Sequence, residues 1–222
     1  ERSGLSGGKK VLVCAPTHFL PPIRETLEKS YDVTYAYRQN YEDILEVIAD
    51  QDAFIVDPGA NYPIDKKMLD RAERLKIIVT PSTGTDHVDK KHCKERNIEF
   101  DSLKGKEEII KEIHASAEFS FTLLLSMVRK LPDALRAVEQ GHWREIEDDL
   151  RGNELFGKKM GIVGYGRIGK KMAGYAAPFG IDVGVFDPFV EIPSEMKTFK
   201  SLDELLKWAD ILSIHVHLDE ST

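Results

Sequence analysis

The chain has 222 residues, of which 41% are hydrophobic and 31% are charged. This length and composition allow one large or two modest domains with real cores, and they exclude disordered and collagen-like chains. The formal net charge of −7 at pH 7 makes nucleic acid and anionic membranes poor partners, because the surface as a whole repels phosphate.

The two cysteines, Cys14 and Cys93, have no paired spacing, which is typical of a reducing, cytoplasmic location. No apolar stretch is long enough to span a membrane, and the N-terminus lacks the apolar core of a signal peptide. The first eight residues are rich in Ser and Gly, so we expect them to lie outside the fold.

From residue 10 to residue 100, short β-rich runs alternate with helical stretches. Strands are predicted at 11–15, 33–37, 53–57, 77–80 and 98–100. Helices are predicted at 22–29, 41–48, 66–73 and 87–96, with Asp86 as a cap of the last one. Near-continuous apolar strands joined by helices predict a parallel sheet that is covered on both faces.

A polar link at 101–106 ends this alternation, and one long helical region is predicted at 107–130. Its apolar residues between 119 and 128 cover more than one helix face, which is typical of a helix buried between domains or subunits. An ordinary core helix explains the same pattern equally well. A further helix is predicted at 132–140, before a polar stretch that runs to residue 153.

The alternation resumes with strands predicted at 160–165, 181–187 and 210–216 and helices at 167–179 and 201–208. Between the first strand and helix lies a G-x-G-x-x-G pattern formed by Gly164, Gly166 and Gly169. The pattern is weak alone, but here it follows an apolar strand, opens a helix and precedes a strand that ends in Asp187, 18 residues after Gly169. The combination predicts the first half of a Rossmann dinucleotide-binding domain.

Each glycine has a steric role in such a turn. Gly164 permits the tight turn, Gly166 lets a pyrophosphate approach the backbone, and Gly169 lets helix and strand pack closely. The anion is then expected on the helix-start amides of Arg167 and Ile168.

Asp187 at the tip of the second strand selects the cofactor. Its carboxylate is expected to accept hydrogen bonds from the adenosine ribose hydroxyls and to repel a 2′-phosphate, which favours NAD over NADP. The alternative is a glycine-rich turn that binds nothing, with Asp187 as a turn residue.

Several motifs in the same order resemble the NAD-dependent D-2-hydroxyacid dehydrogenases. They are STGTDHVD (82–89), ASAEFSFTLLLSMVRKLP (115–132), GHW (141–143), ELFGKKMGIVGYGRIG with the later FDP (154–188), and ADILSIHVHLDEST (209–222). The resemblance implies an α/β protein with a flavodoxin-like substrate domain at 9–104. It also implies an incomplete NAD-binding Rossmann domain at 105–222.

The resemblance also implies site residues. It assigns the substrate carboxylate to the backbone amides of Thr83 and Gly84, and it places Ser116 beside the nicotinamide. The segment that lines the adenosine and nicotinamide ribose is matched by His215, Val216 and His217. A metal pair formed by His215 and His217 is the less favoured alternative, because no Cys or further His is near them in the sequence.

The family interconverts 2-keto acids and D-2-hydroxy acids with an Arg, an acid and a His. Their positions follow the segment that matches 209–222, and no Arg occurs here after Arg167, so no catalytic residue is assigned. We therefore interpret the chain as part of a longer dehydrogenase and expect it to be inactive by itself. His18 follows the first strand and could border a cleft, but we favour a position in a plain surface loop. His87, His92 and His142 are expected at the surface.

Two functions remain open from the sequence. The first is a cytoplasmic oxidoreductase that acts on a small 2-keto or 2-hydroxy acid and forms a homodimer through the apolar region 115–128. The second is a non-catalytic NAD-binding regulatory module, like the corepressor relatives of the family.

Overall fold

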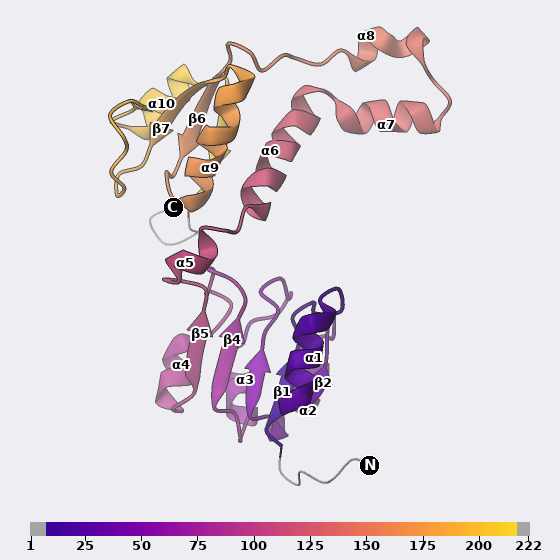
Figure 1. Cartoon of the computed structure of the whole chain (residues 1–222), viewed down its shortest axis with the longest axis vertical. Coiled ribbons are helices and arrows are strands. Elements are labelled where there is room, and N and C mark those ends of the chain that lie inside the picture. Colours follow the sequence, from indigo (N-terminus) through magenta and orange to yellow (C-terminus); the bar gives the residue numbers. More distant parts are fainter. Residues whose placement is uncertain (1–7, 217–222) are drawn as a thin grey trace. The chain divides into compact units, whose positions relative to one another are not determined.

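The computed structural model describes residues 8–216. The chain divides into two compact units, Glu1–Ile110 and Lys111–Thr222 (Figure 1). The N-terminal segment expected outside the fold lies largely outside the described residues, as does His217.

The first unit contains a five-stranded parallel sheet. Its strands are β1 (Lys10–Val13), β2 (Asp32–Tyr35), β3 (Ala53–Ile55), β4 (Ile77–Thr80) and β5 (Glu99–Ser102). They lie in the order β2-β1-β3-β4-β5, which is the flavodoxin-like order that the family resemblance implies. The predicted fold class is therefore confirmed for this unit.

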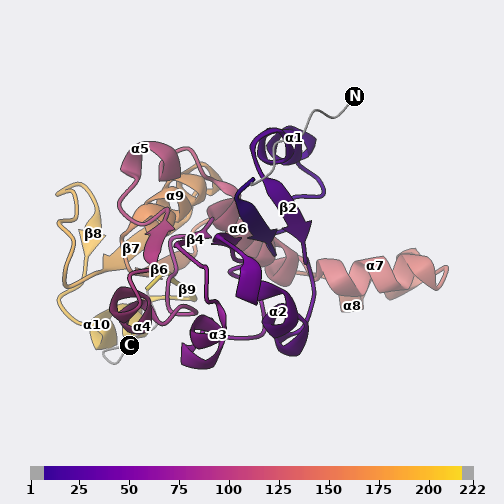
Figure 2. The same cartoon turned by 90° about the horizontal axis from the view of Figure 1, so that it is seen from below.

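The helices of the first unit cover both faces of the sheet. They are α1 (Pro21–Ser30), α2 (Tyr41–Val47), the 3₁₀ turn η1 (Ile48–Asp50), α3 (Lys66–Arg71), α4 (Lys90–Glu95) and α5 (Glu107–Ile110). Figure 2 shows α1 on one side of the sheet and α2, α3 and α4 on the other.

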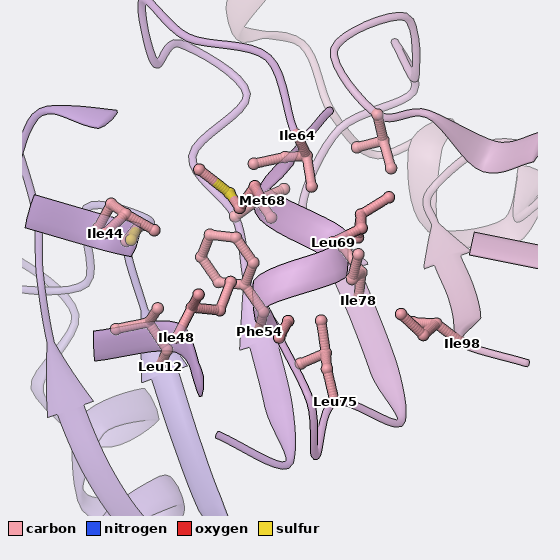
Figure 3. Close-up of a cluster of buried hydrophobic side chains, with 14 of the residues drawn as sticks. Leu12, Ile44, Ile48, Phe54, Ile64, Met68, Leu69, Leu75, Ile78 and Ile98 are labelled. Atoms are coloured by element: carbon pink, nitrogen blue, oxygen red, sulfur yellow. The ribbon is translucent and has the colours of Figure 1, made fainter. Parts of the chain in front are cut away.

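The main core of this unit lies on the side of the sheet that α2, α3 and α4 cover. Phe54 of β3 and Ile78 of β4 are fully buried there, and Ile44, Ile48 and Met68 pack against them from the helical layer (Figure 3). Burial of such side chains contributes about 1.5–3 kcal/mol each. This core holds the strand ends and their loops in place.

The second unit begins with a helical arm. It consists of α6 (Ala115–Val128), α7 (Leu131–Glu139), the 3₁₀ turn η2 (Arg144–Ile146) and α8 (Glu147–Leu150). Figure 1 shows α7 and α8 leading away from the sheet of this unit. Helices η2 and α8 lie in the stretch that we predicted only as polar.

The sheet of the second unit is also parallel. It is built from β6 (Lys159–Val163), β7 (Asp182–Phe186), β8 (Lys197–Thr198) and β9 (Ile211–Ile214), with α9 (Arg167–Ala176), η3 (Ala177–Phe179) and α10 (Leu202–Trp208) between them. The order β8-β7-β6-β9 corresponds to positions 3-2-1-4 of a Rossmann sheet. The short strand β8 was not predicted, because two residues carry no periodicity.

The single helix predicted at 107–130 is wrong. Helix α5 ends at Ile110, and α6 begins at Ala115. In the intervening turn the Lys111 carbonyl accepts a hydrogen bond from Lys171 Nζ (2.9 Å), and the Ile113 carbonyl accepts one from the Arg167 guanidinium (2.9 Å). These side chains of α9 bind carbonyls that a continuous helix would need for its own hydrogen bonds.

Asp86 does not cap α4, contrary to prediction. The cap is Asp89, whose carboxylate accepts from the His92 amide (2.9 Å), while the Asp86 carboxylate accepts from the Thr85 amide (3.2 Å). Residues 87–89 are held outside the helix, because the Ile64 amide donates to the His87 carbonyl (2.7 Å) and the Asp89 amide donates to the Ile64 carbonyl (2.9 Å).

Candidate functional site

The glycine turn between β6 and α9 has the geometry of a nucleotide-binding turn. Gly164 has φ +91°, and a Cβ there would lie 2.6 Å from the His215 carbonyl oxygen. A Cβ on Gly169 would lie 2.1 Å from the Gly164 carbonyl oxygen. Both positions therefore require glycine, for the tight turn and for the close approach of helix and strand.

Gly166 differs from the other two glycines. A Cβ there would meet nothing within 4 Å, so the turn is open to a ligand at this point. The first helical hydrogen bond of α9 runs from the Lys170 amide to the Gly166 carbonyl (3.0 Å). The amides of Arg167 and Ile168 precede that bond and have no acceptor within the helix. They form the positive end of the helix dipole, where an anion is stabilised.

The Arg167 side chain has a hydrogen-bond partner outside the glycine turn. Its guanidinium donates to the Ile113 carbonyl, so it braces the segment before α6. The part of Arg167 that lies at the start of α9 is its backbone amide.

Asp187, just beyond the end of β7, reaches back to the glycine turn. Its Oδ2 accepts from the Tyr165 amide (2.7 Å), and its Oδ1 accepts from the amides of Phe189 (2.9 Å) and Val190 (3.1 Å). A carboxylate has about four acceptor sites, so Oδ2 keeps room for a further donor. The residue thus fixes the turn and still presents an acceptor beside it.

The end of β9 completes this edge of the sheet. A Cβ on Gly164 would lie 3.0 Å from Val216 Cγ1, so Val216 is beside the glycine turn. The His215 ring lies 2.7 Å from the Ser213 hydroxyl, and burial lowers its pKa. His217 falls outside the described residues, and within 8–216 no group of three His, Cys, Asp or Glu side chains could hold a metal.

Ser116 is exposed in the first turn of α6, where its carbonyl accepts from the Ser120 hydroxyl (2.8 Å). Two residues earlier, the His114 ring lies 3.0 Å from Lys171 Nζ and 3.2 Å from the Tyr175 hydroxyl. These contacts hold the start of α6 against α9. Within residues 8–216, the hydrogen bond described for Ser116 stays within α6 and does not reach the glycine turn.

In the first unit, the loop after β4 contains Thr83 and Gly84. The Ser82 hydroxyl donates to the Gly84 carbonyl (2.7 Å) and lies 2.9 Å from the Thr80 hydroxyl, which shapes the loop. Lys90 Nζ donates to the Thr85 hydroxyl (2.8 Å) and brings a positive charge to its far end. The loop is at the carboxyl end of a parallel strand, where ligands of such sheets bind.

His92 is buried, contrary to the prediction that it lies at the surface. It is 7% exposed, and its ring lies between the carboxylates of Asp70 (2.7 Å) and Glu95 (3.0 Å), which raise its pKa. The spacing His92 to Glu95 was visible in the sequence, but Asp70 lies on another helix. His142 is exposed, as predicted, and His87 is half-buried with its pKa lowered by burial.

His18 lies in an exposed loop, as favoured. Its ring lies 5.0 Å from that of Tyr37, and no acid is paired with it in the described residues. Asp57 was not predicted as a site residue, although it follows β3 at the same edge as the loop of Thr83. An acid at the end of the apolar run 53–57 is the sequence feature that could have indicated it.

The chain matches two domains of one family. Residues 11–104 match the catalytic domain, and residues 121–222 match the NAD binding domain, of the D-isomer specific 2-hydroxyacid dehydrogenases. The chain belongs to this family, and NAD is the cofactor of the domain that its second unit matches.

Individual relatives agree with this assignment. The chain is 30% identical over 217 residues to D-3-phosphoglycerate dehydrogenase of Methanocaldococcus jannaschii. This match covers 96% of the chain and 39% of that protein. It is 29% identical over 184 residues to hydroxypyruvate reductase of Thermotoga maritima, over 82% of the chain and 56% of that protein. The chain therefore spans about half the length of these relatives or less.

A solved structure supports the fold. The NAD-dependent formate dehydrogenase of Staphylococcus aureus in complex with NAD is 26% identical and superposes with a TM-score of 0.77, over 96% of this chain and 66% of that one.

In the range 8–216, no helix is both long enough and apolar enough to cross a membrane.

Proposed function

We propose that the whole protein containing this chain is an NAD-dependent dehydrogenase that interconverts a small 2-keto acid and its D-2-hydroxy acid. The observation that carries the proposal is the glycine turn: amides at the start of α9 that have no acceptor within the helix lie next to a carboxylate that is itself bonded to the turn. The family membership adds the reaction class.

The cofactor would lie along the edge formed by β6, β7 and β9. The amides of Arg167 and Ile168 would bind the pyrophosphate, which Gly166 leaves room for, and Asp187 would accept from the adenosine ribose hydroxyls. Further contacts along the ribose and nicotinamide are proposed for Ser116, His215, Val216 and His217. When bound, NAD supplies or accepts the hydride.

The substrate carboxylate would bind to the amides of Thr83 and Gly84. Backbone amides in a loop at the end of a parallel strand form a favourable site for an anion. We propose 9–104 as the substrate domain and 105–222 as the NAD-binding part. The chain carries no residue to which we assign proton transfer, so we propose that residues 1–222 alone do not turn over.

We further propose that the protein is a cytoplasmic homodimer. Phe119, Leu123 and Met127 recur every four residues on α6, and they are 64%, 47% and 76% exposed. This apolar stripe is larger than a solvated helix requires and fits a second copy of the chain. The buried free thiols of Cys14 and Cys93 support the cytoplasmic location.

The test is NADH oxidation, followed by absorbance, with glyoxylate, pyruvate and hydroxypyruvate. The whole protein should reduce at least one of these acids, and residues 1–222 should reduce none. NAD binding without turnover by the whole protein would instead support a regulatory NAD-binding module. Turnover by residues 1–222 would contradict our assignment of the catalytic groups.

A further inference from the structure

Asp57 lies beside the loop that we propose for the substrate carboxylate. In the parallel pair of β3 and β4, Ile55 is opposite Val79, and the Val56 amide donates to the Val79 carbonyl (3.0 Å). Two residues beyond Ile55 and Val79, the chains leave the sheet at Asp57 and Pro81. Neighbouring strands are about 4.8 Å apart, so Asp57 is next to the start of the loop.

The charge of Asp57 acts on this edge. The carboxylate is half-buried, and Oδ1 accepts from the Gly59 amide (2.9 Å), which fixes its position. Burial lowers the pKa of His87, while Asp86 and Asp57 oppose that shift, so Asp57 is within electrostatic reach of the ring. That ring lies 3.3 Å from the Thr80 hydroxyl at the end of β4.

Asp57 also lines a cavity of about 530 Å³ between the loops that follow β2 and β3. Its lining also includes Cys14, Tyr37, Arg38 and Tyr62. In the order β2-β1-β3 this is the point where the connections diverge, which is where open α/β sheets bind ligands.

The lining of the cavity is mostly polar and uncharged. Burial raises the pKa of Cys14 to about 11 and also raises the pKa of Tyr62, so both groups stay neutral at physiological pH. The cation of the lining is Arg38, whose guanidinium lies 5.2 Å from the centre of the Tyr37 ring on the loop after β2. Asp57 is the charged group on the side toward the substrate loop.

The opposite end of that loop carries a cation. Lys90 Nζ contacts the Thr85 hydroxyl (2.8 Å), so its positive charge lies near the amides proposed for the substrate carboxylate. Arg38, the cation of the cavity, lies on the loop after β2, which is farther from that loop in the order β2-β1-β3-β4. A second anionic group on the substrate, extending toward the cavity, would instead meet Asp57. The charges of this edge therefore fit a substrate with one carboxylate.

We propose that the cavity beside Asp57 receives the side group of the 2-keto acid, and that Asp57 selects uncharged or cationic side groups against phosphate. This inference rests on the proposed function and concerns its substrate class. A phosphate carries about −1.5 to −2 charges at pH 7. In a partly solvated site, the repulsion from one nearby carboxylate disfavours such a group by about tenfold.

Hydroxypyruvate and 3-phosphohydroxypyruvate form the test pair, since they differ by the phosphate alone. The whole protein should show a higher kcat/KM for hydroxypyruvate with NADH. Asp57→Asn should lower the ratio of the two kcat/KM values by about tenfold, because the repulsion of phosphate is removed. Asn keeps an oxygen for the Gly59 amide, so the loop is retained.

Asp32→Asn is the matched control. Asp32 is exposed at the amino end of β2, on the opposite edge of the same sheet, and the variant makes the same charge change. It should leave the ratio unchanged. An equal shift in both variants, or no shift in Asp57→Asn, would overturn the inference.

A higher kcat/KM of the unmutated protein for 3-phosphohydroxypyruvate than for hydroxypyruvate would also overturn the inference. If Arg38→Gln then lost that preference, the phosphate would be assigned to Arg38. These outcomes leave the proposed function intact, because they require turnover. Absence of NADH oxidation with every acid tested would overturn the proposed function together with this inference.

Discussion

Two glycines of α9 differ in what a methyl group would meet. At Gly169 a Cβ would lie 2.1 Å from the Gly164 carbonyl oxygen, whereas at Gly174 it would meet nothing within 4 Å. The first contact is with the backbone of the turn itself, which cannot move without opening the turn. The two positions therefore provide a matched pair on one helix.

We expect Gly169→Ala to destabilise the second unit by about 1–3 kcal/mol or more through overpacking. Gly174→Ala should stabilise it by about 0.5–1 kcal/mol, because alanine is the better helix former. Both tryptophans, Trp143 and Trp208, belong to this unit, so urea unfolding followed by their fluorescence measures the effect. Equal stabilities of the two variants would contradict the packing described for the turn.

Asp187 combines two roles, and its variants separate them. Asp187→Ala should weaken NAD binding about 10- to 100-fold, which corresponds to the loss of a charged hydrogen bond of about 1.5–3 kcal/mol. It should also leave the Tyr165 amide without its acceptor. Calorimetric titration of the whole protein with NAD and NADP measures the affinities.

Asp187→Asn is the companion variant, since its side-chain oxygen can still accept from the Tyr165 amide. It should keep the stability of the turn and reduce the preference for NAD over NADP, because the charge that repels a 2′-phosphate is lost. If both variants bind NAD as tightly as the parent, Asp187 is not part of the cofactor site.

At the scale of elements, His92 joins α3 to α4. The neighbouring carboxylates of Asp70 and Glu95 raise its pKa above the ordinary value of 6.5. Its contribution to stability is therefore fully present below pH 6.5 and is lost as the pH rises through the pKa of the folded state. We expect α4 to open more readily at pH 8 than at pH 5.5.

Hydrogen–deuterium exchange of peptides from α4, corrected for intrinsic rates, measures this opening at the two pH values. His92→Gln should remove the pH dependence, because glutamine does not titrate. His142→Gln changes an exposed histidine paired with Glu145 in the other unit and should have no effect on α4. A pH dependence that persists in His92→Gln would assign it to another group.

Periodicity predicted most strands and helices to within a few residues, since apolar runs mark strands and caps mark helix starts. It failed where side chains from distant segments decide the structure. The break before α6 depends on Lys171 and Arg167, and the start of α4 depends on the backbone of Ile64. Neither partner can be recognised from the local sequence.

The residues of the candidate site could be predicted from the sequence in part, as the helices and strands could. Gly164, Gly169 and Asp187 have the spacing of a known turn, and the structure places them together. The bond from the Tyr165 amide to Asp187 and the position of Asp57 beside the loop of Thr83 and Gly84 depend on strand register. A single sequence does not carry that information.

At the scale of the whole molecule, the exposed stripe on α6 bears on assembly. Met127→Glu combined with Phe119→Glu should shift the whole protein from dimer to monomer, because two charges would be buried in the contact. Light scattering at micromolar concentration measures the mass. Leu206→Glu on α10, where the side chain is 45% exposed, is the control and should leave the dimer intact. A monomeric parent would contradict the proposed assembly.

The turn between β6 and α9 is proposed to hold the pyrophosphate of NAD. A crystal structure of the whole protein with NAD would show whether it does. We predict phosphate oxygens within hydrogen-bond distance of the amides of Arg167 and Ile168, with the adenosine ribose on Asp187. NAD bound elsewhere, with these amides facing solvent, would contradict the account.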